Sequence, residues 1–248
     1  EQAYRKKVAD YKLDALKFQC EVFEPKALIP IASYIYFCHE ENYYLNDHIN
    51  TAEKTFHYIK NNTNVFPVIL YNGDEYMYPE KWDSTDSIQK YMADLKNIDL
   101  NQANLVKNAS VELVELHKQA DGFIDNLNKS NNIIVKSLLK PAHIHLHDYD
   151  KTYVLSLGGK LKETPIPYDK CDVSLSSESL LFCMKFPYGL DTTQINGRIQ
   201  KPKGGNYTNF YNIFRIDQQK SRGQEMTLSY LAGAAIRKVK MKLGLYKA

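Results

Sequence analysis

A histidine, two glutamates and an asparagine stand together behind an apolar, aromatic run, in the stretch "YIYFCHEENYYLND" of residues 34–47. Imidazole and carboxylate groups ligate metal ions and transfer protons, so His39, Glu40 and Glu41 are candidate catalytic residues. Strand ends are also polar simply because they meet water. Residue type alone therefore leaves this stretch, the HEEN segment, open between a site and a solvated strand end.

A second group of polar side chains occurs in "HIHLHD", which contains His143, His145, His147 and Asp148. Alternation places the three imidazoles on one face of an extended segment, with neighbours roughly 7 Å apart. Two of them could chelate a metal ion, but an exposed strand face has the same pattern. The order also departs from the His-x-His-x-Asp-His motif of metallo-β-lactamase-type hydrolases, in which clustered imidazoles and a carboxylate hold the metal.

The element expected to deliver the HEEN segment is "ALIPIASYIYF", residues 27–37. Its length and its β-branched and aromatic residues predict a buried strand, and the polar residues follow at its C-terminal end, where α/β folds collect their sites. A helix is expected before it, because apolar residues recur three or four positions apart on one face: Val8, Tyr11, Ala15, Phe18 and Val22. A helix is also expected after it, with Asn46 or Asp47 as its cap.

The rest of the chain shows two kinds of hydrophobic pattern, one before and one after residue 141. Helical periodicity extends over residues 84–96 and 101–127, and the polar stretch at 125–132 is the joint most typical of a domain boundary. Beyond Pro141, period-two alternation and a Gly-Gly turn predict a hairpin, followed by a strand, a helix and two C-terminal helices near 205–217 and 224–243.

Composition is that of a folded globular protein, with 44% hydrophobic and 25% charged residues. The net charge of +3 does not favour a nucleic-acid partner. No apolar run approaches the roughly 20 residues of a membrane span, so a cytoplasmic protein without membrane contact is expected. Four scattered cysteines without a CxxC pair predict reduced thiols. The chain opens at Glu1 within a helical pattern and without a capping signal, which suggests the later part of a longer polypeptide.

Two stretches resemble a known family. "PKALIPIASYIYFCHEENYYLND" is similar to the late segment of metallo-β-lactamase-fold proteins of the ascorbate-phosphate lactonase and CMP-N-acetylneuraminate hydroxylase type, in which a P-F-A-S-F strand runs into C/S-H-x-E-N and a Y-x-N-D/E tail. "LSSESLLFCMKFPYGLDTTQINGRI" resembles the region that follows the hydrolase domain in such proteins. The two stretches occur in the expected order and cover about a fifth of the chain.

The resemblance implies an α/β fold. Residues 1–96 would be the C-terminal part of an αββα sandwich, 97–140 a helical connection, and 141–248 a small α+β domain. The family's principal ligand motif precedes this region, and its last histidine, expected near Pro30 or Ile31, is missing here. His39 is the residue expected to replace it as a metal ligand.

The function implied is metal-dependent hydrolysis of a small, anionic substrate, with zinc, manganese or iron held mostly by an N-terminal half or a partner chain. Glu40 or Glu41 would transfer protons, and Asn42 and Asp47 would orient the reacting groups from behind. Two alternatives stay open: an oxygenase component acting on a sugar nucleotide, as in the hydroxylase branch, or a non-catalytic binding subunit that keeps the hydrolase frame.

Overall fold

The computed structural model describes residues 2–31, 34–100, 105–131 and 133–223, together with residues 233, 236, 237, 239 and 240. Within these residues the chain is a mixed α/β protein with eight α-helices and two small sheets. It divides into two compact units, Glu1–Lys107 (unit 1) and Asn108–Ala248 (unit 2). The helix expected at 224–243 lies mostly outside the described residues.

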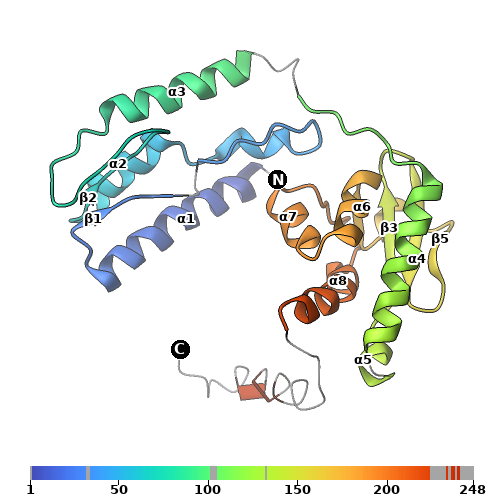
Figure 1. Cartoon of the computed structure of the whole chain (residues 1–248). Coiled ribbons are helices and arrows are strands. Elements are labelled where there is room, and N and C mark those ends of the chain that lie inside the picture. The colour runs from blue at the N-terminus through green and yellow to red at the C-terminus, as the bar shows by residue number, and fades with distance from the viewer. Residues whose placement is uncertain are drawn as a thin grey trace. The chain divides into compact units, whose positions relative to one another are not determined.

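In its described part, unit 1 has three α-helices, one 3₁₀ helix and one short pair of strands (Figure 1). In chain order these are α1 (Gln2–Phe23), β1 (Ala27–Leu28), η1 (Tyr43–His48), α2 (Ala52–Asn62), β2 (Phe66–Pro67) and α3 (Thr85–Leu100). Helix α2 contacts both α1 and α3. It begins at Thr51, whose hydroxyl accepts a hydrogen bond from the backbone N–H of Lys54, so neither Asn46 nor Asp47 is its cap.

The strand expected over residues 27–37 is wrong for most of its length, since Ala27–Leu28 is the only part of it that forms a strand among residues 27–31 and 34–37, which the structure describes. β1 runs parallel to β2, and the last ladder bond is donated by Val68 N–H to the carbonyl of Leu28. The next bond of a parallel ladder requires the N–H of residue 30, which is a proline and has none. The ladder therefore stops, and Ile35 further along is 49% exposed instead of buried.

The helix expected before this strand is confirmed as α1, but its predicted apolar face is not the face that it buries. Ala9, Leu13 and Cys20 are its buried residues. Tyr11 is 70% exposed and Phe18 is 64% exposed. The core of unit 1 is small, formed by Cys20 with Ile59, Val65 and their neighbours.

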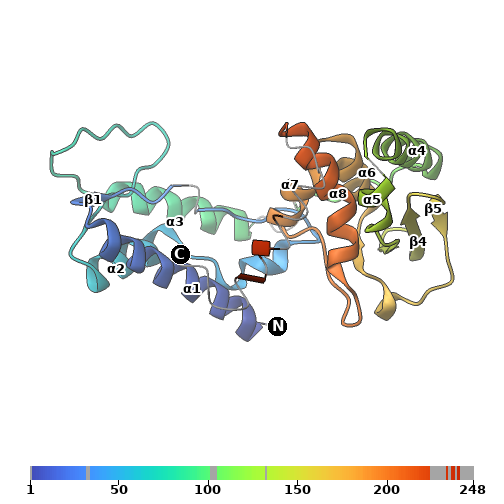
Figure 2. The same ribbon diagram turned by 90° about the horizontal axis from the view of Figure 1, so that it is seen from below.

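Unit 2 places helices against a four-stranded sheet (Figure 2). Its elements are α4 (Leu113–Ser130), α5 (Ile133–Ser137), β3 (Ala142–Leu146), β4 (Lys151–Ser156), β5 (Lys160–Glu163), η3 (Tyr168–Lys170), β6 (Val173–Leu175), α6 (Ser177–Lys185), α7 (Gly189–Ile195) and α8 (Tyr207–Ser221). The strand order is β5-β4-β3-β6. β3 and β4 form the expected antiparallel hairpin, β5 is antiparallel to β4, and β6 is parallel to β3.

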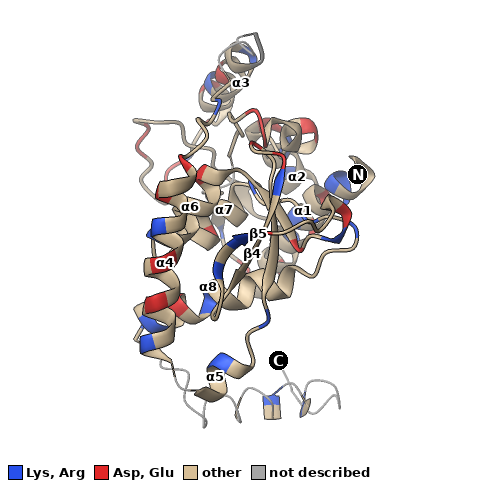
Figure 3. Cartoon of the chain, turned by 90° about the vertical axis from the view of Figure 1, so that its right-hand side faces the viewer, with Lys and Arg blue, Asp and Glu red and all other residues tan. Residues whose placement is uncertain are grey.

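One continuous hydrophobic core holds unit 2 together. Residues of α4, the sheet, α6 and α8 share it, among them Leu116, Ile124, Ile144, Leu180 and Phe210, each 0% exposed. The structure thus draws the boundary between units at Lys107 and Asn108, inside the segment 97–140 that was expected to be a helical connection. Helix α4 carries residues of both signs of charge (Figure 3). Lys160 of β5 forms ion pairs with two of its acidic residues, Asp121 and Asp125.

No helix among the described residues has both the length and the apolar character that crossing a membrane requires.

Candidate functional site

The HEEN segment follows β1 and includes most of η1, and a distant stretch of unit 1 bonds its backbone. Val106 donates its N–H to the carbonyl of Cys38 at 2.9 Å and accepts the N–H of Glu40 at 3.1 Å. His39 is thereby bridged to Val106 in parallel register. This bridge gives the backbone of residues 38–40 one hydrogen-bonded partner, Val106.

Asn42 closes the segment into a turn. Asn42 is 2% exposed, and its Oδ1 accepts a hydrogen bond from the backbone N–H of His39 at 3.1 Å. The carbonyl of His39 in turn accepts the N–H groups of Asn42 and Tyr43, at 3.1 and 2.9 Å. An Asn side chain that bonds nearby backbone groups stabilises a turn in this way. Asn42 therefore contacts the backbone of His39.

Asn46 makes a contact that the sequence alone did not indicate. Its side-chain amide lies against Phe37: Oδ1 accepts the Phe37 N–H at 2.9 Å, and Nδ2 donates to the Phe37 carbonyl at 2.8 Å. Asp47, the neighbour expected to orient the site, instead pairs with Arg5 of α1 at 2.6 Å. The guanidinium of Arg5 also lies 5.2 Å from the centre of the Tyr44 ring. Asp47 thus ties η1 to α1.

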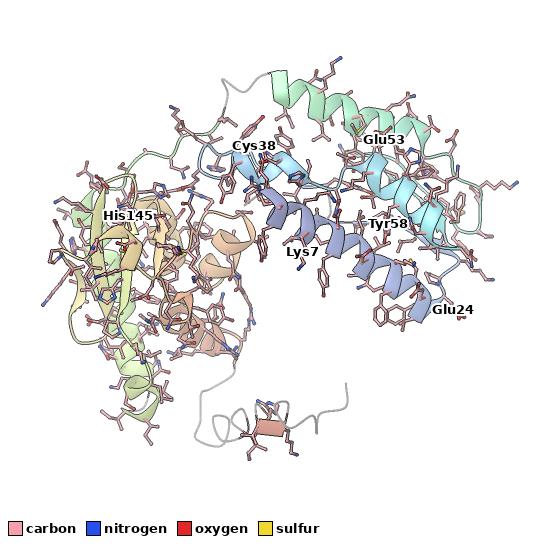
Figure 4. All side chains as sticks on the ribbon, turned by 180° about the vertical axis from the view of Figure 1, so that it is seen from behind. Lys7, Glu24, Cys38, Glu53, Tyr58 and His145 are labelled. Carbon is pink, nitrogen blue, oxygen red and sulfur yellow. The ribbon has the colours of Figure 1, made fainter. Side chains whose placement is uncertain are left out.

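The three candidate catalytic residues differ in their exposure. His39 and Glu41 are partly buried, whereas Glu40 is exposed and pairs with Lys107 at 3.4 Å. Cys38, labelled in Figure 4, is exposed, and its Sγ lies 3.7 Å from the carbonyl oxygen of Tyr36. Among the described residues no group of three or more His, Cys, Asp or Glu side chains is placed to hold a metal ion.

Tyrosines of the HEEN segment pack against one another and against Tyr91 of α3. The hydroxyl of Tyr36 donates to the hydroxyl of Tyr43 at 3.2 Å, with the two rings edge to face. The ring centres of Tyr34 and Tyr91 lie 4.9 Å apart, and Tyr91 donates its hydroxyl to the carbonyl of Leu70. Burial raises the pKa of Tyr34 well above its ordinary value. These tyrosines pack around the turn. Tyr36 and Tyr91 donate hydrogen bonds there, whereas the buried hydroxyl of Tyr34 has no hydrogen-bond partner among the described residues.

His143 and His145 lie on one face of β3, as alternation predicts, but separate carboxylates contact them. Nδ1 of His143 lies 3.7 Å from Oδ2 of Asp172. Asp172 is 5% exposed and accepts the backbone N–H groups of His143 and Asn206. Asp172 therefore links β3 to the loop before α8 through these hydrogen bonds. His147 and Asp148 lie beyond the end of β3, where Asp148 accepts the N–H and hydroxyl of Ser177 at the start of α6.

His145 completes a Ser-His-Asp arrangement, with Nδ1 3.2 Å from Oγ of Ser174 and Nε2 3.4 Å from Oδ1 of Asp150. Catalytic triads need an accessible serine and a buried carboxylate. Here Ser174 is 2% exposed, whereas the side chain of Asp150 is 98% exposed. The burial is the reverse of a working triad, so this is a structural contact. His145, visible in Figure 4, packs edge to face against Tyr168.

Comparison of the chain with protein-family models, with curated proteins and with solved structures gave no match.

Proposed function

We propose that the HEEN segment is one wall of the active site of a metal-dependent hydrolase. The observation that carries the proposal is the way the turn is held. Val106, Asn42 and Asn46 bond the backbone of residues 37–40, and those bonds use neither the imidazole of His39 nor the carboxylates of Glu40 and Glu41. A rigid backbone that carries polar side chains suits a catalytic site, because such sites need preorganised groups.

In this proposal each residue has a separate task. His39 would be one ligand of the metal, and Glu40 or Glu41 would accept a proton from the attacking water and return it to the leaving group. Asn42 holds the backbone of His39. A zinc, manganese or iron ion, when bound, would supply an activated water and a Lewis acid for the scissile group. The remaining ligands would come from an N-terminal half or a partner chain, as the resemblance to metallo-β-lactamase-fold proteins implies.

A second candidate function is a non-catalytic binding subunit. Glu40 favours it, because this carboxylate is exposed and pairs with Lys107, an arrangement that also suits a solvated turn. The two functions differ in what His39 contributes, since a binding subunit has no need of its imidazole as a ligand.

Metal content separates them. The protein expressed from its complete reading frame is purified, reconstituted with zinc, manganese or iron in turn, and measured by elemental analysis and by hydrolysis of a panel of small phosphorylated and lactone substrates. We expect bound metal, and we expect His39→Ala to lower metal affinity or turnover by about 10–100-fold. His48→Ala is the matched control, since His48 lies at the end of η1. Unchanged metal content and turnover in His39→Ala would refute the hydrolase proposal.

A further inference from the structure

Between β1 and the bridge of His39 to Val106, the described backbone of the chain belongs to no strand that would set its register. β1 ends at Leu28 because Pro30 cannot donate to the ladder, and none of residues 29–31 or 34–36 is assigned to a strand. Successive side chains of an extended segment point to opposite sides, so a slip of one residue turns every side chain to the other face. The position of the imidazole of His39 thus depends on what fixes the chain after β1.

Asn46 supplies a substitute for the missing strand. The side-chain amide carries an acceptor and a donor in one plane, as a peptide group does. Against Phe37 it uses both, at 2.9 and 2.8 Å, and so bonds the N–H and the carbonyl that a neighbouring strand would bond. A shift of the chain by one residue would break both bonds together. Asn46 belongs to η1, which the ion pair of Asp47 with Arg5 ties to α1.

We infer that Asn46 is the positioning residue of the candidate site: by clamping Phe37, it decides on which side of the chain His39 presents its imidazole. The inference rests on the proposed function for the role of that imidazole, and on the hydrogen bonds alone for the clamp. Asn46 acts through the backbone and does not need to touch substrate or metal. Asn42 then completes the geometry by accepting the N–H of His39.

The clamp can be tested in the 248-residue chain by amide hydrogen exchange. The informative amides are those of His39 and Tyr43, because Asn46 accepts neither of them: they donate to Asn42 Oδ1 and to the carbonyl of His39. Loss of two hydrogen bonds in Asn46→Ala should speed exchange at both amides by about tenfold or more. Asn62→Ala is the matched control, because Asn62 donates a single bond to Tyr58 within α2. Equal exchange rates in the wild type and Asn46→Ala would overturn the inference.

The role in the site is tested by a double-mutant cycle in the complete protein, with circular dichroism confirming that each variant is folded. Asn46→Ala should lower kcat by about 10–100-fold with little change in KM, as outer residues around a site do. Because it acts through His39, adding it to His39→Ala should cause no further loss. Multiplied losses in the double variant would overturn the inference.

The variant Asn46→Asp separates the two hydrogen bonds that Asn46 makes with Phe37. It keeps the acceptor for the Phe37 N–H and removes the donor to the Phe37 carbonyl, so its kcat should fall between the wild type and Asn46→Ala. If His39→Ala leaves turnover and metal content unchanged, the proposed hydrolase function fails, and the exchange rates of the His39 and Tyr43 amides still decide whether Asn46 is the clamp.

Discussion

Two histidine-bearing segments, one in each unit, are held by opposite means. In unit 2, His143 and His145 stand on β3, whose register is set by full ladders to β4 and β6 and whose other face is buried in a large core. In unit 1, His39 follows a strand of two residues and is positioned by the side chains of Asn42 and Asn46 and by one backbone partner, Val106.

The difference teaches where chemistry can reside. The β3 histidines are placed by the fold itself, and their polar contacts, to Asp172 and Ser174, are structural. The turn around His39 is held by the side chains of Asn42 and Asn46. Functional residues are often found on connecting segments held by a firm scaffold, and the HEEN segment fits that description better than β3 does.

The largest effect should come from removing apolar side chains in the two segments. Ile144 in β3 is 0% exposed and Ile35 before the HEEN segment is 49% exposed. Ile144→Ala should lower the free energy of unfolding by about 2–5 kcal/mol, because it leaves a cavity in the core of unit 2. Ile35→Ala should change it by less than about 0.5 kcal/mol. Guanidinium unfolding followed by circular dichroism measures both, and similar losses would show that residues 34–37 are as buried as β3.

The cysteines of the two units should differ in their dependence on pH. Burial raises the pKa of Cys183 in α6 from 9.0 to about 12, whereas Cys38 before His39 is exposed. The folded state keeps the Cys183 proton at a pH where the unfolded state has lost it. The contribution of Cys183 to stability should therefore be constant below pH 9 and fall by about 1.4 kcal/mol per pH unit between 9 and about 12.

The cysteine comparison is measured by denaturation at several pH values, with Cys183→Ala as the control that lacks this dependence. In parallel, a thiol reagent at pH 8 should label Cys38 in the native protein and Cys183 only after unfolding. Rapid native labelling of Cys183 would mean that α6 is less buried than its 3% exposure indicates.

The smallest effect should come from Asp47, the neighbour of the clamp. Its ion pair with Arg5 is partly exposed, with side-chain exposures of 37% and 16%, and such pairs contribute about 0–1 kcal/mol. Asp47→Asn should leave the exchange rate of the His39 amide unchanged and reduce stability by no more than that amount, less so at high salt. A loss of turnover equal to that of Asn46→Ala would return Asp47 to the site, as the sequence pattern first suggested.

Local patterns predicted much of the fold. The spacing of Val8, Tyr11 and Phe18 predicted α1, and the alternation after Pro141 predicted the β3–β4 hairpin, because periodicity and turn residues act within a few positions of the chain. The candidate site was found in the same way, as a run of residue types able to do chemistry. The contact of Asn46 with Phe37 was not predicted, because a hydrogen bond across a turn leaves no periodic pattern in the sequence. The one available signal was the presence of two asparagines, Asn42 and Asn46, in a short stretch.

The amino-acid order by itself indicated where α1 and the β3–β4 hairpin lie, and it placed His39, Glu40 and Glu41 side by side. Tertiary structure decided the rest: that α1 buries Ala9 and Leu13 and exposes Tyr11, that β1 stops at Leu28, and that Asn46 rather than Asp47 holds the turn. The physical reason is that burial and hydrogen bonding depend on partners distant in the chain. Periodicity marks the faces of an element, but it does not say which neighbour will cover them.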